Sequence, residues 1–100
     1  MITVLRGDNN MYLIESGERR FFIEQDGQKF AEITYTPVGD DTIIIDHTFV
    51  SDALRGQRIA EKLVYKVVEK ARMENKKIIP LCPFAKSQFM RHEEYQDVLK

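Results

Sequence analysis

The sequence has few of the features that mark secreted, membrane-spanning or nucleic-acid-binding proteins. Its single cysteine, Cys82, excludes an internal disulfide and a zinc site built from several cysteines. No apolar run approaches the roughly 18 residues that cross a bilayer. Residues 1–6 lack the basic start, apolar middle and cleavage site of a signal peptide. Fifteen basic against sixteen acidic residues give a net charge of −1, without the basic excess of a nucleic-acid-binding domain. We therefore expect a cytoplasmic protein with neither a membrane nor a nucleic-acid partner.

The length predicts one small domain over residues 1–100. A chain of this size buries roughly 60–70% of the surface that it exposes when unfolded, which supports one hydrophobic core but not two. Hydrophobic residues make up 43% of the chain and charged residues 31%, and this globular balance argues against disorder.

The first half of the chain has the pattern of β-strands. Asp26-Gly27 is typical of a hairpin turn, and the strand after it alternates apolar and polar side chains. The three consecutive isoleucines at residues 43–45 indicate a strand that is covered on both faces. Four strands are expected here, at residues 11–15, 20–25, 28–36 and 42–50.

The second half begins with a helix. From residue 57 to residue 75 the apolar side chains recur every three or four positions, which predicts an amphipathic helix about 28 Å long. Residues 77–81 form a fifth strand, and Pro83 begins a short second helix. A strand–helix–strand unit of this length makes a parallel pair with a right-handed crossover. The predicted fold class is α/β (α+β), with a mixed, mostly antiparallel sheet, one parallel strand–helix–strand unit and a short C-terminal helix.

The link between the fourth strand and the long helix carries an anion-binding pattern. Gly56 lets a ligand approach the backbone, and Arg55 and Arg58 add two cations. The first turn of a helix presents unpaired N–H groups and the positive end of the dipole, which suit a phosphate or a pyrophosphate. The same residues also fit an ordinary solvated helix start that is capped by Ser51 or Asp52.

Cys82 and His47 are the candidate catalytic residues. Cys82 ends a strand just before a helix, and a helix N-terminus stabilises a thiolate, so Cys82 is either a nucleophile or general acid or a small buried hydrophobe. An imidazole such as that of His47 could take a proton from an amine. His47 follows Ile45 by two residues and should share its face, where it could instead be a hydrogen-bonded core residue. The two histidines and the cysteine are too scattered for us to expect a metal site.

The segment Arg55-Gly56-Gln57-Arg58-Ile59-Ala60 resembles the Q/R-x-x-G-x-G/A signature of the GNAT superfamily of N-acetyltransferases. Arg55 matches its first position and Ala60 its last, whereas Arg58 stands where the family usually has glycine. Together with residues 46–50, the Pro-Leu-Cys-Pro-Phe run at residues 80–84 and residues 91–95, it resembles a minimal single-domain branch of that superfamily. The resemblance covers residues 21–99.

This resemblance implies an acetyl-CoA-dependent N-acetyltransferase whose acceptor is an unidentified primary amine of a small molecule, a protein lysine or a protein N-terminus. It implies that backbone amides in residues 55–60 hold the coenzyme A pyrophosphate, that the end of the fourth strand pairs with the pantetheine arm, and that Cys82 lies near the thiol of the coenzyme. The candidate cofactor-binding residues are therefore Phe49, Val50, Arg55, Gly56, Gln57, Arg58, Ile59, Ala60, Cys82 and Phe84.

Two departures from the branch leave other functions open. Phe49 stands where the branch often has glutamate, and Glu93 where it often has proline. Without that glutamate, the protein could be a coenzyme A-binding or protein-interaction module with little catalytic activity. A third class, a cysteine hydrolase, would need Cys82 paired with His47 or His92.

Three further residues in the last segment have possible roles. Lys86 and Arg91 are candidates for contacts with the nucleotide phosphates. Tyr95 either protonates a leaving thiolate, as a tyrosine does in many GNAT enzymes, or packs as an aromatic side chain; we favour packing.

Overall fold

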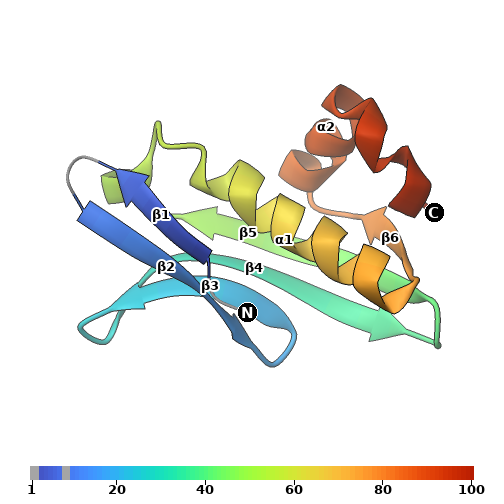
Figure 1. Ribbon diagram of the computed structural model, residues 1–100, viewed down its shortest axis with the longest axis horizontal. Helices are drawn as coiled ribbons and strands as arrows, with labels where there is room; N and C mark the ends of the chain where they lie inside the picture. The colour runs from blue at the N-terminus through green and yellow to red at the C-terminus, as the bar shows by residue number, and fades with distance from the viewer. Residues whose placement is uncertain (1–2, 8–9) are drawn as a thin grey trace.

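The computed structural model describes residues 3–7 and 10–100, with side chains from Tyr12 onwards (Figure 1). Six strands form one sheet, in which they lie in chain order. The strands are β1 Thr3–Gly7, β2 Asn10–Gly17, β3 Arg20–Gln25, β4 Gln28–Val38, β5 Thr42–Val50 and β6 Lys77–Pro80. The helices are α1 Ile59–Glu74 and α2 Pro83–Arg91, and two short 3-10 helices, η1 Asp52–Leu54 and η2 Glu93–Val98, complete the order.

The sheet topology confirms the predicted fold class. Each neighbouring pair from β1 to β5 is antiparallel, and β5 pairs with β6 in parallel. The helix α1 makes the crossover between these two parallel strands (Figure 1). Strand β1 and the turn η2 were not predicted, since neither segment has a clear apolar period.

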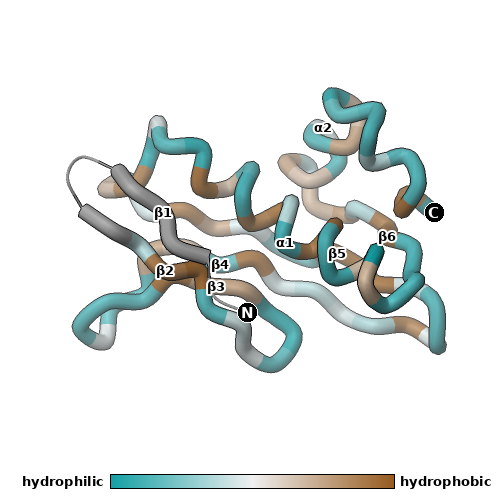
Figure 2. The backbone as a smooth tube through the Cα atoms, viewed as in Figure 1, coloured by the Kyte–Doolittle hydropathy of each residue, from teal (hydrophilic) through white to brown (hydrophobic). Residues whose placement is uncertain are grey.

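The hydrophobic core lies on one face of the sheet. Ile23, Ile33 and Ile45 are fully buried, and so are Leu63 and Val67 of α1. Buried residues of α2 belong to the same cluster. Figure 2 shows hydrophobic residues along the inner strands and hydrophilic residues in the connecting loops.

We call the other face of the sheet the open face; over β5 it is covered by none of the helices in the described part of the chain. Ile44 points to it and is only half-buried, whereas its neighbours Ile43 and Ile45 are buried. The prediction that residues 43–45 are covered on both faces is therefore wrong. Both helices contribute to the core on the opposite face, so the middle isoleucine keeps part of its surface in water.

A β-bulge interrupts β5 in its middle. Tyr35 pairs with Ile45, but the next pair along the two strands joins Thr34 to His47, so that Asp46 is an extra residue. A bulge reverses the alternation of side chains between the two faces of a sheet. Asp46 and His47 are consequently both exposed.

The reversal decides which residues of β5 face the helices. Beyond the bulge, Thr48 and Val50 lie on the side of α1, and His47 and Phe49 lie on the open face. The prediction that His47 shares a face with Ile45 is therefore wrong. That prediction assumed a regular strand, and the pattern of apolar residues does not indicate that Asp46 is an extra residue.

The parallel strands separate before β5 ends. Their ladder has four residue pairs, the last of which is Ile45 with Pro80. The N–H groups of Leu81 and Cys82 then both donate to the carbonyl oxygen of Ile45, at 3.2 and 3.3 Å, and the chain turns into α2. The rest of β5, up to Val50, continues without β6 beside it. This open edge lies at the carboxyl ends of the parallel strands, where ligands favour binding.

Candidate functional site

A cavity of about 510 Å³ opens where β5 ends and α1 begins. Its volume lies in the range of small-molecule sites. It is lined by Thr48, Val50, Leu54, Arg55, Gly56, Arg58, Ile59, Ala60, Glu61 and Phe84.

The loop before α1 is built by η1. Ser51 caps this short turn, since its hydroxyl accepts a hydrogen bond from the N–H of Ala53 at 3.3 Å. Leu54 is buried and anchors the turn in the core. An ion pair of 2.7 Å joins the exposed side chains of Asp52 and Arg55. Ser51 and Asp52 thus organise η1, and the alternative in which either of them caps the long helix is wrong.

The N-terminus of α1 is left open instead. Its N-cap is Arg58, which has left-handed backbone angles (φ 58°, ψ 30°) and makes no capping hydrogen bond with its side chain. The N–H of Lys62 donates to the carbonyl of Arg58 at 3.2 Å and is the first to bond within the helix. The N–H groups of residues 59–61 therefore have no partner inside α1. All three of these residues line the cavity.

Gly56 is required by its backbone angle and not by a lack of space. Its φ is +85°, a backbone conformation that residues other than glycine rarely adopt. A Cβ atom built there would meet nothing within 4 Å. The turn at Gly56 thus brings bare backbone to the cavity beside the helix N-terminus.

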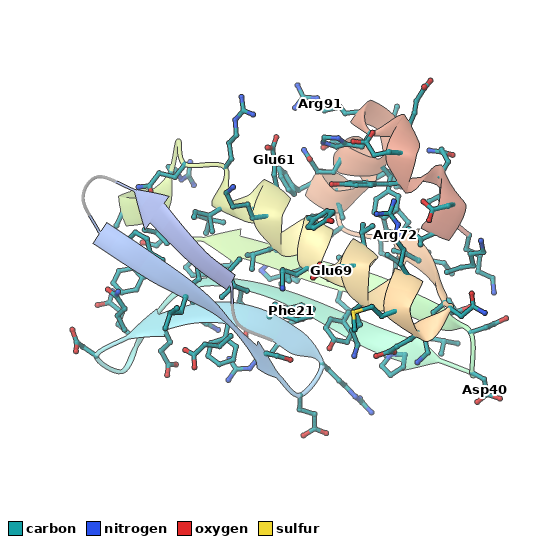
Figure 3. The ribbon with its side chains drawn as sticks, viewed as in Figure 1. Phe21, Asp40, Glu61, Glu69, Arg72 and Arg91 are labelled. Carbon is teal, nitrogen blue, oxygen red and sulfur yellow. The ribbon has the colours of Figure 1, made fainter. Side chains whose placement is uncertain are left out.

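Charges at the cavity favour an anion. Arg55 and Arg58 both line it, as does one carboxylate, Glu61, which projects from the first turn of α1 (Figure 3). Arg55 is paired with Asp52, whereas Arg58 has no ion pair within the described part of the chain. The side chain of Arg58 and the positive end of the helix dipole therefore remain available to a negatively charged group.

Cys82 lies next to this cavity but is not one of its lining residues. It is the N-cap of α2 and is only 8% exposed. Its Sγ lies 3.2 Å from Oγ1 of Thr48, a residue of the lining. No histidine hydrogen-bonds to Cys82 in residues 12–100, so the cysteine–histidine pair that a hydrolase needs is not formed in this structure.

The cavity gathers most of the predicted cofactor-binding residues. The side chains of His47 and Phe49 lie on the open face, and neither residue is part of the cavity lining. Gln57 is half-buried and lies outside the lining. The predicted residues that do line the cavity are Val50, Arg55, Gly56, Arg58, Ile59, Ala60 and Phe84.

Three lining residues were not among the predicted cofactor-binding residues: Thr48, Leu54 and Glu61. Glu61 could have been found, because it lies in the first turn of the predicted helix, three positions after Arg58. The face of Thr48 could not be assigned from the sequence, because it depends on the bulge in β5.

The candidates on the last segment lie outside this lining. Lys86 and Arg91 are exposed on α2, and Arg91 projects outward from its end (Figure 3). The ring of Tyr95 is 5.5 Å from that of Phe89 and 4.8 Å from that of His92. Burial, together with the nearby carboxylate of Glu94, raises the pKa of Tyr95. These contacts support the prediction that Tyr95 packs as an aromatic side chain.

The described residues also bear on metal binding and on membrane insertion. Among residues 12–100, no three His, Cys, Asp or Glu side chains are arranged to hold a metal ion. The described helices include none that is long and apolar enough to cross a membrane.

Comparison with known proteins places the chain in a family. The profile of the GCN5-related N-acetyltransferase family matches residues 20–98. The solution structure of a GCN5-like protein from Staphylococcus aureus, described as an N-acetyltransferase, has 46% sequence identity and a TM-score of 0.74, over 87% of this chain and 86% of that one. No curated protein sequence matches.

Two more distant structures share the fold alone. N-acetylglutamate synthase from Neisseria gonorrhoeae has 19% identity and a TM-score of 0.59, over 73% of this chain and 18% of its own. Ribosomal-protein-alanine N-acetyltransferase from Brucella melitensis biovar Abortus 2308 has 18% identity and a TM-score of 0.59, over 72% and 60%. The family profile and the 46% identical relative carry the assignment: this chain belongs to the family of GCN5-related N-acetyltransferases.

Proposed function

We propose that this protein transfers an acetyl group from acetyl-CoA to a primary amine, and that the cavity at the start of α1 binds the coenzyme. One observation carries the proposal: the open N-terminus of α1, with Gly56 and two arginines, lies beside the unpaired edge of β5. Acetyl transfer is the activity of the family. The Neisseria gonorrhoeae neighbour was solved as a complex with coenzyme A.

The phosphate end of the site would be formed by the start of α1. The free N–H groups of residues 59–61 donate to phosphate oxygens, as helix N-termini commonly do. Arg58 adds a cation at the same place, and its left-handed backbone lets it occupy a position where the signature has glycine. Arg58 is exposed, so its side chain can swing toward a phosphate without filling the cavity.

The acetyl end would be formed by the open edge of β5. Unpaired backbone groups of Thr48 and Val50 are available to the amide-rich pantetheine arm, and an N–H there would polarise the thioester carbonyl. Acetyl-CoA supplies the activated acyl group. The amine nitrogen forms a bond to the acyl carbon while the carbon–sulfur bond breaks.

Cys82 is our candidate for the proton donor in this step. Thr48 holds its thiol at the edge of β5 by the 3.2 Å contact. The thiol of Cys82 gives its proton to the departing sulfur of coenzyme A. The proton that the attacking amine loses then reprotonates Cys82. The acetyl group passes directly to the amine, and no acetyl-cysteine is formed. Bringing amine and thioester together on one scaffold supplies much of the rate.

The second candidate function is a coenzyme A-binding module with little activity. It is favoured by Phe49, which stands in place of the glutamate that is frequent in the branch and points its ring to the open face. This residue therefore brings no carboxylate to the edge of β5.

Calorimetric titration with acetyl-CoA tests the site. Arg58→Ala should weaken binding about tenfold at low salt, since a charge-assisted contact contributes ~1.5 kcal/mol. Arg19→Ala is the matched control, because Arg19 is also an exposed arginine with a left-handed backbone (φ 59°) but lies in the turn between β2 and β3. Equal affinities of the two variants would contradict the proposed site.

Release of free coenzyme A in the presence of a panel of amines then separates the two functions. Turnover with any amine establishes the transferase. Tight binding of acetyl-CoA without turnover establishes the binding module.

A further inference from the structure

The bulge in β5 creates a polar site on the open face, opposite the proposed coenzyme A cavity. It turns two neighbouring side chains, Asp46 and His47, to the same exposed surface. The next residue, Thr48, faces the cavity and contacts Cys82. The bulge begins where the ladder between β5 and β6 ends, so the open-face site lies beside the open edge of β5.

Asp46 is held in place and keeps capacity for a cation. The hydroxyl of Thr36 donates to its Oδ2 at 2.7 Å, which fixes the carboxylate over the open face. In the described part of the chain, no lysine, arginine or histidine forms an ion pair with it. The neighbouring carboxylate on this face, Glu32, is by contrast already paired with Arg20 and Lys29.

Apolar side chains flank the bulge. Phe49 lies two residues beyond His47 on the open face and is 38% exposed, and Leu81, which follows the end of β6, is 59% exposed. An aliphatic arm can pack on such side chains while its charged end reaches a carboxylate. The surface is shallow, since all four of these side chains are exposed, and so it suits one long side chain of an extended polymer better than a small molecule that must be enclosed.

We infer that the acceptor is the side chain of a lysine in a polypeptide, which docks on the open face with its ammonium group on Asp46. This inference rests on the proposed function, because it needs the thioester to lie at the edge of β5. His47, the adjacent exposed side chain, is placed to accept the proton that the ammonium must lose before it attacks. The net reaction converts the ammonium and the thioester into the N-acetyl amide, free coenzyme A and one released proton.

The test uses the full chain and an Nα-acetylated, C-terminally amidated peptide with one lysine. Asp46→Asn should raise the KM for this peptide about tenfold, the size of one charge-assisted contact, and leave the affinity for acetyl-CoA unchanged. His47→Gln should lower kcat by a factor on the order of 100 with little change in KM. Asp40→Asn is the matched control, since Asp40 is an exposed carboxylate in the turn at the far end of β5 (Figure 3) and should leave both constants unchanged.

Asparagine keeps an oxygen that can accept the hydrogen bond from Thr36, so the Asp46→Asn variant should fold, and an unchanged melting temperature checks this. If acetyl-CoA binds and a free diamine is acetylated but the lysine peptide is not, the inference is overturned and the transferase stands. If Asp46→Asn behaves like Asp40→Asn, the inference is also overturned. If acetyl-CoA does not bind to the unmodified protein, both the inference and the proposed function are overturned.

Discussion

The hydroxyl of Thr48 and the thiol of Cys82 lie 3.2 Å apart, across the gap that opens where β5 and β6 separate. The position of each residue depends on an irregular feature of the chain next to it. Thr48 faces the gap because of the bulge at Asp46, and Cys82 faces it because the chain turns into α2 directly after Pro80. The contact thus joins the cavity lining to the buried thiol, and it is the part of the site where we expect the chemistry.

Removing the thiol tests its role. Cys82→Ala should lower kcat about tenfold or more, because a proton donor would be lost, while the affinity for acetyl-CoA stays the same. Cys82→Ser keeps a hydroxyl that can bond to Thr48 and should retain more activity. Steady-state kinetics with calorimetric binding measure both. Full activity of Cys82→Ala would show that the cysteine only fills space.

The left-handed N-cap of α1 predicts an unusual effect on stability. Arg58→Gly should unfold at higher urea concentration than Arg58→Ala, with a free energy of unfolding roughly 1 kcal/mol larger, because alanine retains the steric cost of φ 58° and glycine does not. The same comparison at Arg19, which has φ 59°, should give a similar difference in stability. Substitutions at the two positions should differ in their effect on binding, since only the Arg58 variants should have a lower affinity for acetyl-CoA. Equal stability of Arg58→Gly and Arg58→Ala would mean that the N-cap relaxes to other backbone angles.

The turn at Gly56 and the direction of His47 show how much of the candidate site can be predicted from the sequence. The turn at Gly56 and the helix after it are local features, because glycine and the apolar period of α1 each constrain their own neighbourhood, and both were predicted. The direction of His47 was not, because one extra residue at Asp46 reverses it and the bulge depends on the pairing of β5 with β4. A sequence period assigns faces only while the strand is regular.

The C-terminal turn illustrates a second limit. Nothing in the sequence around Glu93–Val98 predicts η2, because its position depends on a contact 25 residues away. Nε and Nη2 of Arg72 each donate to the carboxylate of Asp97 at 3.0 Å, and Nη2 also donates to the carbonyl of Glu94 at 2.6 Å. Such a contact between α1 and η2 is set by the tertiary fold, which the local pattern does not report.

This contact predicts a pH dependence of stability. The hydrogen bonds from Arg72 hold the pKa of Asp97 below its ordinary value of 3.8. A carboxyl group whose pKa is lowered by folding stabilises the protein above that ordinary value, and the contribution is lost as the pH falls through the lowered value. Asp97→Asn should therefore unfold at lower urea than the unmodified protein at about pH 6, and the difference should shrink toward about pH 3. Asp40→Asn serves as the control. A difference that grows on acidification would contradict this assignment.

Tyr95 allows packing and proton donation to be distinguished. Tyr95→Phe keeps the ring contacts with Phe89 and His92, so it should leave both the fold and turnover nearly unchanged. Tyr95→Ala should cost ~3 kcal/mol of unfolding free energy, because it opens a cavity beside the core. Absorbance titration of the unmodified protein against Tyr95→Phe should locate the phenol's ionisation above pH 10.0, since burial raises its pKa. Loss of turnover in Tyr95→Phe would instead identify it as the proton donor.

Whether the start of α1 and the open edge of β5 bind acetyl-CoA can be measured by an amide-resolved NMR titration with acetyl-CoA. We expect chemical-shift changes concentrated in residues 48–50 and 55–61 and around Cys82, with little change at Arg20 and Phe22 on the open face of β3. Changes centred on the open face, or none at millimolar ligand, would contradict this binding site.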